Sequence, residues 1–162
     1  MIAFVILHYR AADMTRKCVE RIKALEGDKK IVIVDNASPN GTGQELLDEY
    51  AEDSEIKVIL NPENSGFAKG NNMGVRWVQE NVPADFVVVL NNDVEILQKD
   101  FCPKVEAIYH RHSFDVLGPD IISVFSGIHQ NPKSLHGYSL ESVRKKREKV
   151  ARTKNPILLL LS

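Results

Sequence analysis

The chain alternates short apolar runs with longer segments of mixed polarity. Apolar runs occupy 2–7, 31–34, 56–60 and 86–90, interrupted only by Lys57, and they are rich in valine and isoleucine. Such runs are typical of strands that are buried on both faces of a sheet. The pattern therefore predicts a strand at each run, and the sequence DVLG at 115–118 predicts the beginning of a fifth strand.

The segments between these runs carry apolar residues at helical spacing. They predict helices over about 14–25, 43–51, 67–80 and 99–112. Asp13 is expected to cap the first helix, and Asn64 and Ser65 are expected to cap the third. Phe67, at the start of the third helix, is expected to face the core. Strands that alternate with helices predict an α/β fold, a Rossmann-like, mostly parallel sheet with helices on both faces.

Polar side chains follow each predicted strand at its carboxyl end. They are His8, Tyr9 and Arg10, then Asp35 and Asn36, then 61–65, and finally Asn91, Asn92 and Asp93. Ligands of open parallel sheets bind beyond the carboxyl ends of the strands. These positions are therefore the candidate site.

Composition narrows the possible functions. The 162 residues are 43% apolar and 27% charged, with a formal net charge of -1, which argues against a nucleic-acid partner. Cys18 and Cys102 stand far apart without other ligands at metal-site spacing, which favours a reducing, cytoplasmic compartment. No apolar run reaches the roughly 18 residues that a membrane-spanning helix needs.

Several nucleotide-binding and hydrolytic classes lack their motifs. The turn HYRAAD at 8–13 has no glycine, which argues against a nicotinamide or flavin dehydrogenase despite Asp35 at the end of the second strand. The sequence contains neither a P-loop nor a G-x-S-x-G nucleophile turn. The remaining set of an aromatic ring, carboxylates, amides and Lys69 suits a nucleoside diphosphate. Taken singly, Tyr9 could equally be a packed aromatic residue, and Asp35 a turn-former.

Four motifs carry a resemblance to a known family. They are VILHYR at 5–10, VIVDNAS at 32–38, NSGFAKGNNMG at 64–74 and VVVLNNDVEI at 87–96. In this order they resemble the family-two glycosyltransferases, inverting enzymes of the GT-A fold, and among these the rhamnosyltransferase-like members that build bacterial surface polysaccharides.

The resemblance implies a nucleotide-sugar donor, UDP- or dTDP-linked, a saccharide or lipid-linked acceptor, and Mn²⁺ or Mg²⁺. It implies that Tyr9 lies against the base and that Asp35 contacts the base or ribose. Asn36, Lys69 and Asn92 are further candidate contacts to the nucleotide, and Asn92 could equally only shape the turn. It also implies that Asp93 is the metal-binding carboxylate. Residues 1–123 would then be the nucleotide-sugar-binding core, and the reaction would run in the cytoplasm, with peripheral binding to the inner face of the membrane left open.

The sequence departs from the family in two ways. Asn91 stands where the D-x-D motif has its first carboxylate, so metal and nucleotide are expected to bind cooperatively. The family's catalytic base belongs to a later motif, and 124–162 is expected to be only the start of the acceptor-binding half. Asp120 and Glu141 are the nearest carboxylates, and neither is expected to be the base. We therefore expect residues 1–162 to bind nucleotide but to transfer sugar poorly.

Other features have plainer interpretations. Gly66, Gly70 and Gly74 recur every fourth residue and predict a smooth helix stripe for close packing. His110 and His112 are expected to be surface residues. The basic stretch 141–154 is expected to be a solvated helix face rather than a membrane-binding patch.

Two rival functions stay open, a nucleotidyltransferase and a non-catalytic nucleotide-sugar-binding module.

Overall fold

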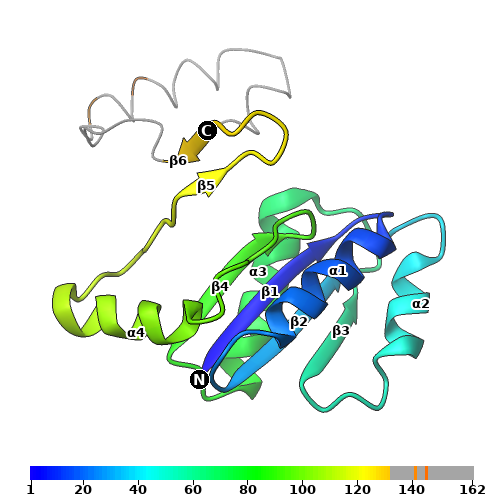
Figure 1. The fold of residues 1–162 in the computed structure, drawn as a ribbon. Helices are drawn as coiled ribbons and strands as arrows, with labels where there is room; N and C mark the ends of the chain where they lie inside the picture. Colours follow the sequence, from blue (N-terminus) through cyan, green and yellow to red (C-terminus); the bar gives the residue numbers. More distant parts are fainter. Residues whose placement is uncertain (132–140, 142–144, 146–162) are drawn as a thin grey trace. The chain divides into compact units, whose positions relative to one another are not determined.

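A computed structural model describes residues 1–131, 141 and 145 of the chain. It divides into two compact units, Met1–Ser113 and Phe114–Ser162. The first unit contains a four-stranded sheet in the order β3-β2-β1-β4, in which every neighbouring pair is parallel (Figure 1). The predicted α/β fold class is confirmed.

The strands of this sheet lie close to the predicted apolar runs. They are β1 (Ile2–His8), β2 (Lys29–Asp35), β3 (Ile56–Leu60) and β4 (Phe86–Asn91). The two central strands are the most buried, because each is paired on both edges and covered on both faces. Phe4, Ile6, Ile31 and Ile33 are all fully buried. Burial of one such side chain stabilises the fold by about 1.5–3 kcal/mol.

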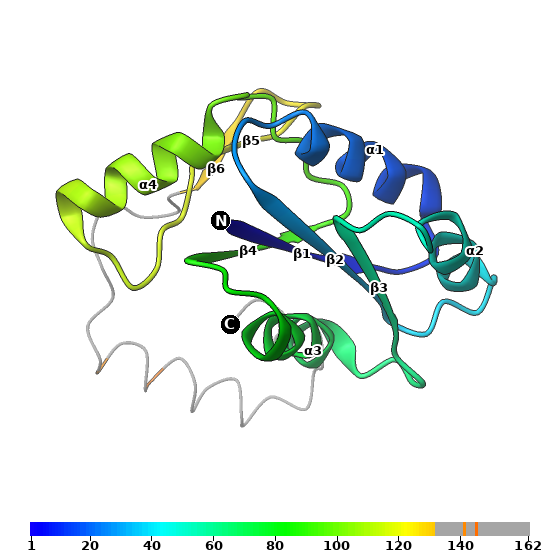
Figure 2. The same cartoon turned by 90° about the horizontal axis from the view of Figure 1, so that it is seen from below.

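The helices lie on both faces of the sheet. They are α1 (Ala12–Lys23), α2 (Thr42–Glu49), α3 (Gly66–Asn81) and α4 (Phe101–His112). Seen from below in Figure 2, α3 lies on one face of the sheet, and α1 and α4 lie on the other. The α2 helix packs against β3 and α1.

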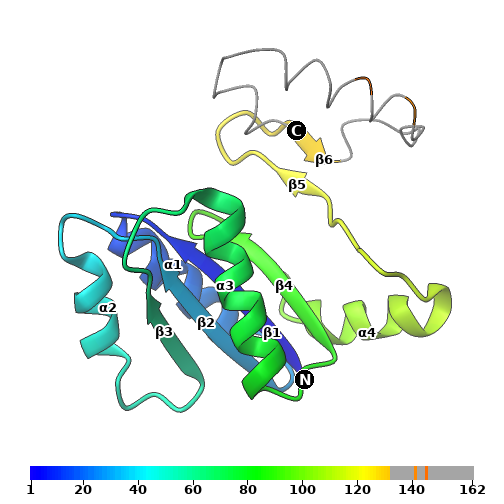
Figure 3. The ribbon, with the colours of Figure 1, turned by 180° about the vertical axis from the view of Figure 1, so that it is seen from behind.

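The glycine stripe lets α3 approach the sheet closely, as Figure 3 shows from behind. A Cβ atom on Gly70 would lie 2.6 Å from Leu7 Cδ1, and one on Gly74 would lie 2.5 Å from Val5 Cγ1. The prediction of close packing is confirmed at these two positions. Gly66 has a different role, because its φ of 80° starts the helix in a backbone conformation that other residues rarely adopt.

Three local predictions were wrong. Residues 115–118 form no strand, and Val116 is 89% exposed; the next strands are β5 (Ile121–Ile122) and β6 (His129–Asn131), an antiparallel pair within the second unit. Phe67 is 50% exposed, because the turn at Gly66 and the glycine face of α3 direct it away from the sheet. The first helix begins before Asp13, so its carboxylate accepts from Arg16 Nη1 instead of capping the helix.

Candidate nucleotide-binding site

The parallel register brings the predicted site residues to one edge of the sheet. His8 lies opposite Asp35 at the ends of β1 and β2, Leu7 lies opposite Asn91 of β4, and Asp35 lies opposite Leu60 of β3. The loops that follow these strands therefore meet at the carboxyl edge. This is where an open parallel sheet binds its ligands.

Asp35 is buried, with 5% of its surface exposed, and it closes the turn after β2. Its two carboxylate oxygens accept from the Ser38 backbone N–H, each at 3.2 Å, and the Ser38 hydroxyl donates to Oδ1 at 2.5 Å. A Cβ atom on Gly43 would lie 2.2 Å from Asp35 Oδ2, so only glycine leaves room for the carboxylate here. Asp35 is thus the turn-former that the sequence left open, and its contact with a nucleotide stays a prediction.

Asn36 joins the ends of β2 and β3 to the start of α3. Its Oδ1 accepts from Asn61 Nδ2 at 3.1 Å and from the Ser65 backbone N–H at 3.2 Å, and its Nδ2 donates to Asn64 Oδ1 at 3.0 Å. Asn64 Oδ1 also accepts from the Gly66 N–H at 3.1 Å, so Asn64 does help to start α3 as predicted. The Ser65 hydroxyl instead accepts from Asn61 Nδ2 at 2.8 Å.

The loop after β1 places the candidate base platform at the surface. Tyr9 is 39% exposed, and the Arg10 guanidinium lies over its ring at 4.8 Å from the ring centroid. Arg10 has a φ of 67°, and its backbone N–H donates to the Ser38 hydroxyl at 2.8 Å. The loops after β1 and β2 are therefore tied together beneath an aromatic face that a base can stack on.

Lys69 lines a cleft of about 610 Å³ between α3 and β3. Asn61 and Ser65 line the same cleft at the end nearest the strand ends, and Arg76 and Trp77 line it further along α3. The exposed ammonium of Lys69 is thus placed beside the Asn36 cluster. This position is compatible with the predicted contact to the nucleotide, which stays a prediction.

The end of β4 presents the candidate metal ligand. Asn91 and Asp93 are exposed, and no other described residue forms a hydrogen bond or ion pair with the Asp93 carboxylate. The neighbouring Glu95 is not available, because Lys17 and Arg21 bind its two oxygens at 2.6 and 3.0 Å. These contacts hold the pKa of Glu95 below its ordinary value.

The described residues do not provide a complete metal site. Among residues 1–131, 141 and 145, no three His, Cys, Asp or Glu side chains cluster in a way that could hold a metal ion. One carboxylate beside an amide still fits Mg²⁺ or Mn²⁺, since such ions keep several waters and take further oxygens from phosphates. The residues present therefore fit a metal that arrives with its nucleotide.

Asp120 and Glu141 lie outside this site-forming unit and already have partners. His129 Nδ1 lies 2.7 Å from Asp120 Oδ2, and Lys145 Nζ lies 2.7 Å from Glu141 Oε1. Both contacts are solvent-exposed. The expectation that neither carboxylate is the catalytic base stays a prediction.

The remaining predictions concern the histidines, the cysteines, membrane-spanning helices and the basic stretch. His110 and His112 are exposed, as expected, and Cys18 and Cys102 are free, buried thiols. Burial raises the pKa of the Cys18 thiol to about 12, and the negative charge of Asp93 adds to this effect. None of the helices in the described part of the chain is long and apolar enough to cross a membrane. The role of 142–144 and 146–154 in the basic stretch lies outside the described residues.

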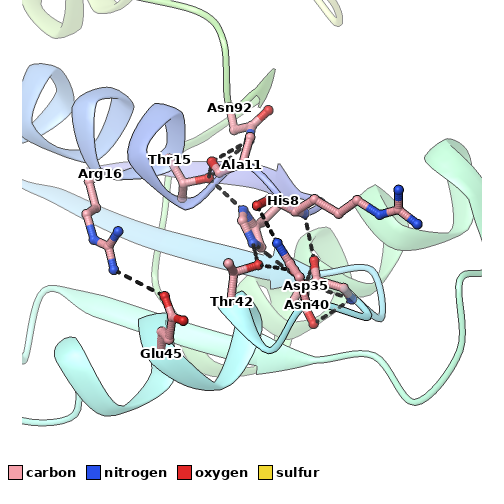
Figure 4. Close-up of polar contacts among 11 residues, drawn as sticks. His8, Ala11, Thr15, Arg16, Asp35, Asn40, Thr42, Glu45 and Asn92 are labelled. Atoms are coloured by element: carbon pink, nitrogen blue, oxygen red, sulfur yellow. Dashed lines mark hydrogen bonds and ion pairs between the residues drawn. The ribbon is translucent and has the colours of Figure 1, made fainter.

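Sequence reasoning missed a buried polar cluster behind the strand ends. His8 is fully buried, and its ring contacts Thr15 of α1 and Thr42 of α2 (Figure 4). Asn92 Nδ2 donates to Thr15 Oγ1 at 3.1 Å and to the Ala11 carbonyl at 3.4 Å, and the predicted contact of Asn92 with the nucleotide stays a prediction. The residues of this cluster are far apart in the sequence, so no local pattern could have grouped them.

Comparison with known proteins gives a consistent result. The family description "Glycosyl transferase family 2" matches residues 3–159. The chain is 26% identical over 122 residues to the low-salt glycan biosynthesis hexosyltransferase Agl10 of Haloferax volcanii, a match that covers 75% of this chain and 37% of the relative.

Solved structures share the fold. S. aureus TarS 1–349 in complex with UDP superposes with a TM-score of 0.57 at 18% identity, covering 68% of this chain and 32% of TarS. The mannosyltransferase PcManGT from Pyrobaculum calidifontis, in complex with GDP-Man and Mn²⁺, gives a TM-score of 0.52 at 19% identity, covering 60% of this chain and 29% of PcManGT. The chain spans about a third of the length of these relatives.

Proposed function

The chain belongs to glycosyl transferase family 2, and we propose that it binds the nucleotide-sugar donor of an inverting sugar transfer. The single observation that carries this proposal is the convergence of Tyr9, Asn36 and Asp93 at the carboxyl edge of one parallel sheet. Relatives with the same fold were crystallised with UDP, UDP-GlcNAc and GDP-Man, which supports a nucleoside diphosphate as the leaving group.

Each side of the site has a distinct role in this proposal. Tyr9 stacks on the base, while Asp35 and Asn36 hold the loops that border the base and ribose. Lys69 reaches the donor from the α3 side. Asp93 would hold Mn²⁺ or Mg²⁺, and the bound ion would stabilise the negative charge of the departing diphosphate.

The chemical step that fits the family is a single displacement. An acceptor hydroxyl oxygen bonds to the anomeric carbon as the bond from that carbon to the phosphate oxygen breaks, and the anomeric configuration inverts. A carboxylate base takes the hydroxyl proton; we assign this role to none of the described residues. A missing base lowers the rate about 10²–10⁴-fold.

The donor and acceptor classes are also proposals. The sequence motifs resemble rhamnosyltransferase-like members, and the relative from Haloferax volcanii is called a hexosyltransferase. We therefore propose a hexose or deoxyhexose donor and a saccharide or lipid-linked acceptor. We place the reaction in the cytoplasm, where nucleotide sugars are used, at the inner face of the membrane when the acceptor is lipid-linked.

A thermal-shift panel tests this function. UDP, dTDP and GDP are each added with and without Mn²⁺ to residues 1–162. A nucleotide at a hundred times its Kd stabilises the folded state by about 2.7 kcal/mol, which raises Tm by roughly 5–10 °C for a chain of this size. We expect one nucleotide to give this shift, with a larger shift when Mn²⁺ is present.

Two outcomes would count against the proposal. One is the absence of any shift with all three nucleotides. The other is a shift that Mn²⁺ removal and Asp93→Ala both leave unchanged, which would favour a metal-independent binding module over a metal-dependent transferase.

A further inference from the structure

The ring of His8 is buried behind the strand ends that form the proposed site. It is fully buried, with Nδ1 2.7 Å from Thr15 Oγ1 and Nε2 2.9 Å from Thr42 Oγ1. Burial lowers the pKa of His8, although Asp35 opposes this effect and Arg16 adds to it. The imidazole is therefore neutral at pH 7, with one nitrogen that donates and one that accepts.

The neighbouring groups decide which nitrogen carries the proton. The Thr42 hydroxyl donates to Asn40 Oδ1 at 2.8 Å, so its oxygen must accept from His8 Nε2–H. Asp35 Oδ1 lies 3.9 Å from Nε2 and also favours a proton there. Nδ1 then accepts from the Thr15 hydroxyl. The alternative tautomer would turn that hydroxyl toward the Ala11 carbonyl, which is 3.3 Å away.

This assignment gives one continuous chain of hydrogen bonds with a single direction. Asn92 Nδ2 donates to Thr15, Thr15 to His8, His8 to Thr42 and Thr42 to Asn40. Asn40 Nδ2 then donates to the Arg10 carbonyl at 3.0 Å. Figure 4 shows this chain running from the loop after β4 to the loop after β1. Aligned hydrogen bonds polarise and strengthen one another in a buried environment.

The two ends of this hydrogen-bond chain are adjacent to the two halves of the proposed donor site. Asn92 directly precedes Asp93, and Arg10 directly follows Tyr9. The hydrogen-bond chain thus joins the loop of Asp93, the candidate metal ligand, and the loop of Tyr9, the candidate base platform, to the buried ring of His8.

We propose that His8 is a positioning residue that sets the spacing between the Asp93 loop and the Tyr9 loop through this directed hydrogen-bond chain. The inference rests on the proposed function, because it concerns the same nucleotide site. It assigns a role in donor binding to the exposed Asn40 and to His8, Thr15 and Thr42, although these three are buried.

Substitutions on either side of the His8 ring test the two halves of the hydrogen-bond chain one at a time. Thr15→Val and Thr42→Val each keep the shape and remove one hydroxyl. Thr15→Val removes the link from Asn92 to the His8 ring and leaves Asn92 Nδ2 only its longer bond to the Ala11 carbonyl, at 3.4 Å. It should therefore leave the metal-free Kd of the nucleotide within twofold and reduce the factor by which Mn²⁺ tightens binding. Thr42→Val disconnects Asn40 and Arg10, so it should weaken metal-free binding and leave the Mn²⁺ factor within twofold.

The expected size of each effect is that of one hydrogen bond, about twofold to tenfold. His8→Gln supplies a donor toward Thr42 but no acceptor toward Thr15, so it should behave like Thr15→Val. The matched control is His112→Gln, at the exposed end of α4, which should change neither quantity. Isothermal titration calorimetry with UDP, dTDP and GDP, with and without Mn²⁺, gives both quantities.

The outcomes separate this inference from the proposed function. If the unsubstituted protein binds a nucleotide and all variants share its Kd and its Mn²⁺ factor, the positioning role of His8 is wrong and the proposed function stands. Variants that lose only thermal stability lead to the same conclusion. If the unsubstituted protein binds none of the nucleotides, the proposed function fails and the positioning role with it.

The direction of the hydrogen-bond chain, which depends on the tautomer of His8, has an independent test. In ¹⁵N NMR spectra at pH 7, Nε2 of His8 should carry the proton and Nδ1 should not, without any ligand. A proton on Nδ1, or on both nitrogens, would overturn the assignment. This measurement does not depend on nucleotide binding.

Discussion

The ends of β2 and β3 differ sharply from the end of β4. At β2 and β3, Asp35, Asn36 and Asn61 are no more than 5% exposed and form hydrogen bonds with loop residues. At β4, Asn91 and Asp93 are exposed, and the Asp93 carboxylate forms no hydrogen bond or ion pair with any described residue. The buried side of the proposed site, at β2 and β3, is therefore held together by the protein's own hydrogen bonds, whereas the exposed side, at β4, depends on oxygens that the ligand brings.

This difference follows from what covers each strand end. β2 is a central strand, and the end of β3, although β3 lies at an edge of the sheet, is covered by the loop before α3, where Asn61 contacts Asn36 and Ser65. A polar group that is buried there must find partners, because an unsatisfied one costs about 1–3 kcal/mol. β4 lies at the other edge, and Asn91 and Asp93 at its end are exposed, so their polar groups are available to a ligand.

The largest expected effect comes from crowding the buried side. In Gly43→Ala the new methyl group would displace the Asp35 carboxylate, and we expect a loss of about 3 kcal/mol in the free energy of unfolding, measured by urea denaturation. A double-mutant cycle with Asp35→Ala provides the control. The methyl group should be tolerated better once the carboxylate is gone, and an unchanged loss would refute a clash with Asp35.

A smaller loss is expected from Asn36→Ala. Without this amide, Asn61 Nδ2 and the Ser65 N–H each lose a partner, so we expect a loss of about 2 kcal/mol. Nucleotide affinity should fall with it, because the loop before α3 is released. The exposed Asn81→Ala is a matched control for the unfolding measurement and should stay within about 0.5 kcal/mol. Equal losses of unfolding free energy in the two variants would show that the buried Asn36 amide matters no more to stability than an exposed one.

On the exposed side, stability and binding should separate. Asp93→Asn is expected to change the free energy of unfolding by less than about 0.5 kcal/mol, because the exposed carboxylate forms no hydrogen bond or ion pair with a described residue. The same variant should abolish the tightening of nucleotide binding by Mn²⁺, an effect of about tenfold or 1.4 kcal/mol if one ligand is lost. Calorimetry with and without EDTA measures this effect. If Asp93→Asn is destabilised and its nucleotide binding still responds to Mn²⁺, Asp93 supports the fold and does not bind the metal.

The smallest effect concerns the ring that joins the two sides. The pKa of His8 is lowered from 6.5 by burial, so the unfolded chain takes up a proton before the folded protein does as the pH falls. The contribution of His8 to stability should therefore be full above pH 6.5 and decrease below it, with a slope of at most about 1.4 kcal/mol per pH unit. Urea denaturation between pH 7.5 and 5 measures this slope. His8→Gln should flatten it by comparison with His112→Gln, and parallel pH profiles for the two variants would show that His8 makes no such contribution.

The sequence could predict what depends on local pattern. The four strands of the main sheet, the helices between them and the polar strand ends follow from apolar runs and their boundaries, and the register then brings those ends together. The expected burial on both faces holds for β1 and β2, whereas β3 and β4 have exposed positions such as Val87 and Val89. Phe67 shows the limit of the same reasoning. Its helical spacing was right, but the glycine face of α3, not the phenylalanine, packs on the sheet.

Which polar residues serve the fold and which stay available could not be read from residue type. Asp35 and Asp93 are both carboxylates after buried strands, yet one is enclosed by Ser38 and Gly43 and the other is exposed. The strand, its apolar length and the polar residue at its end are local properties and are encoded locally. Burial and hydrogen-bond partners depend on residues such as Thr15 and Thr42, which only the folded sheet and its helices bring to His8.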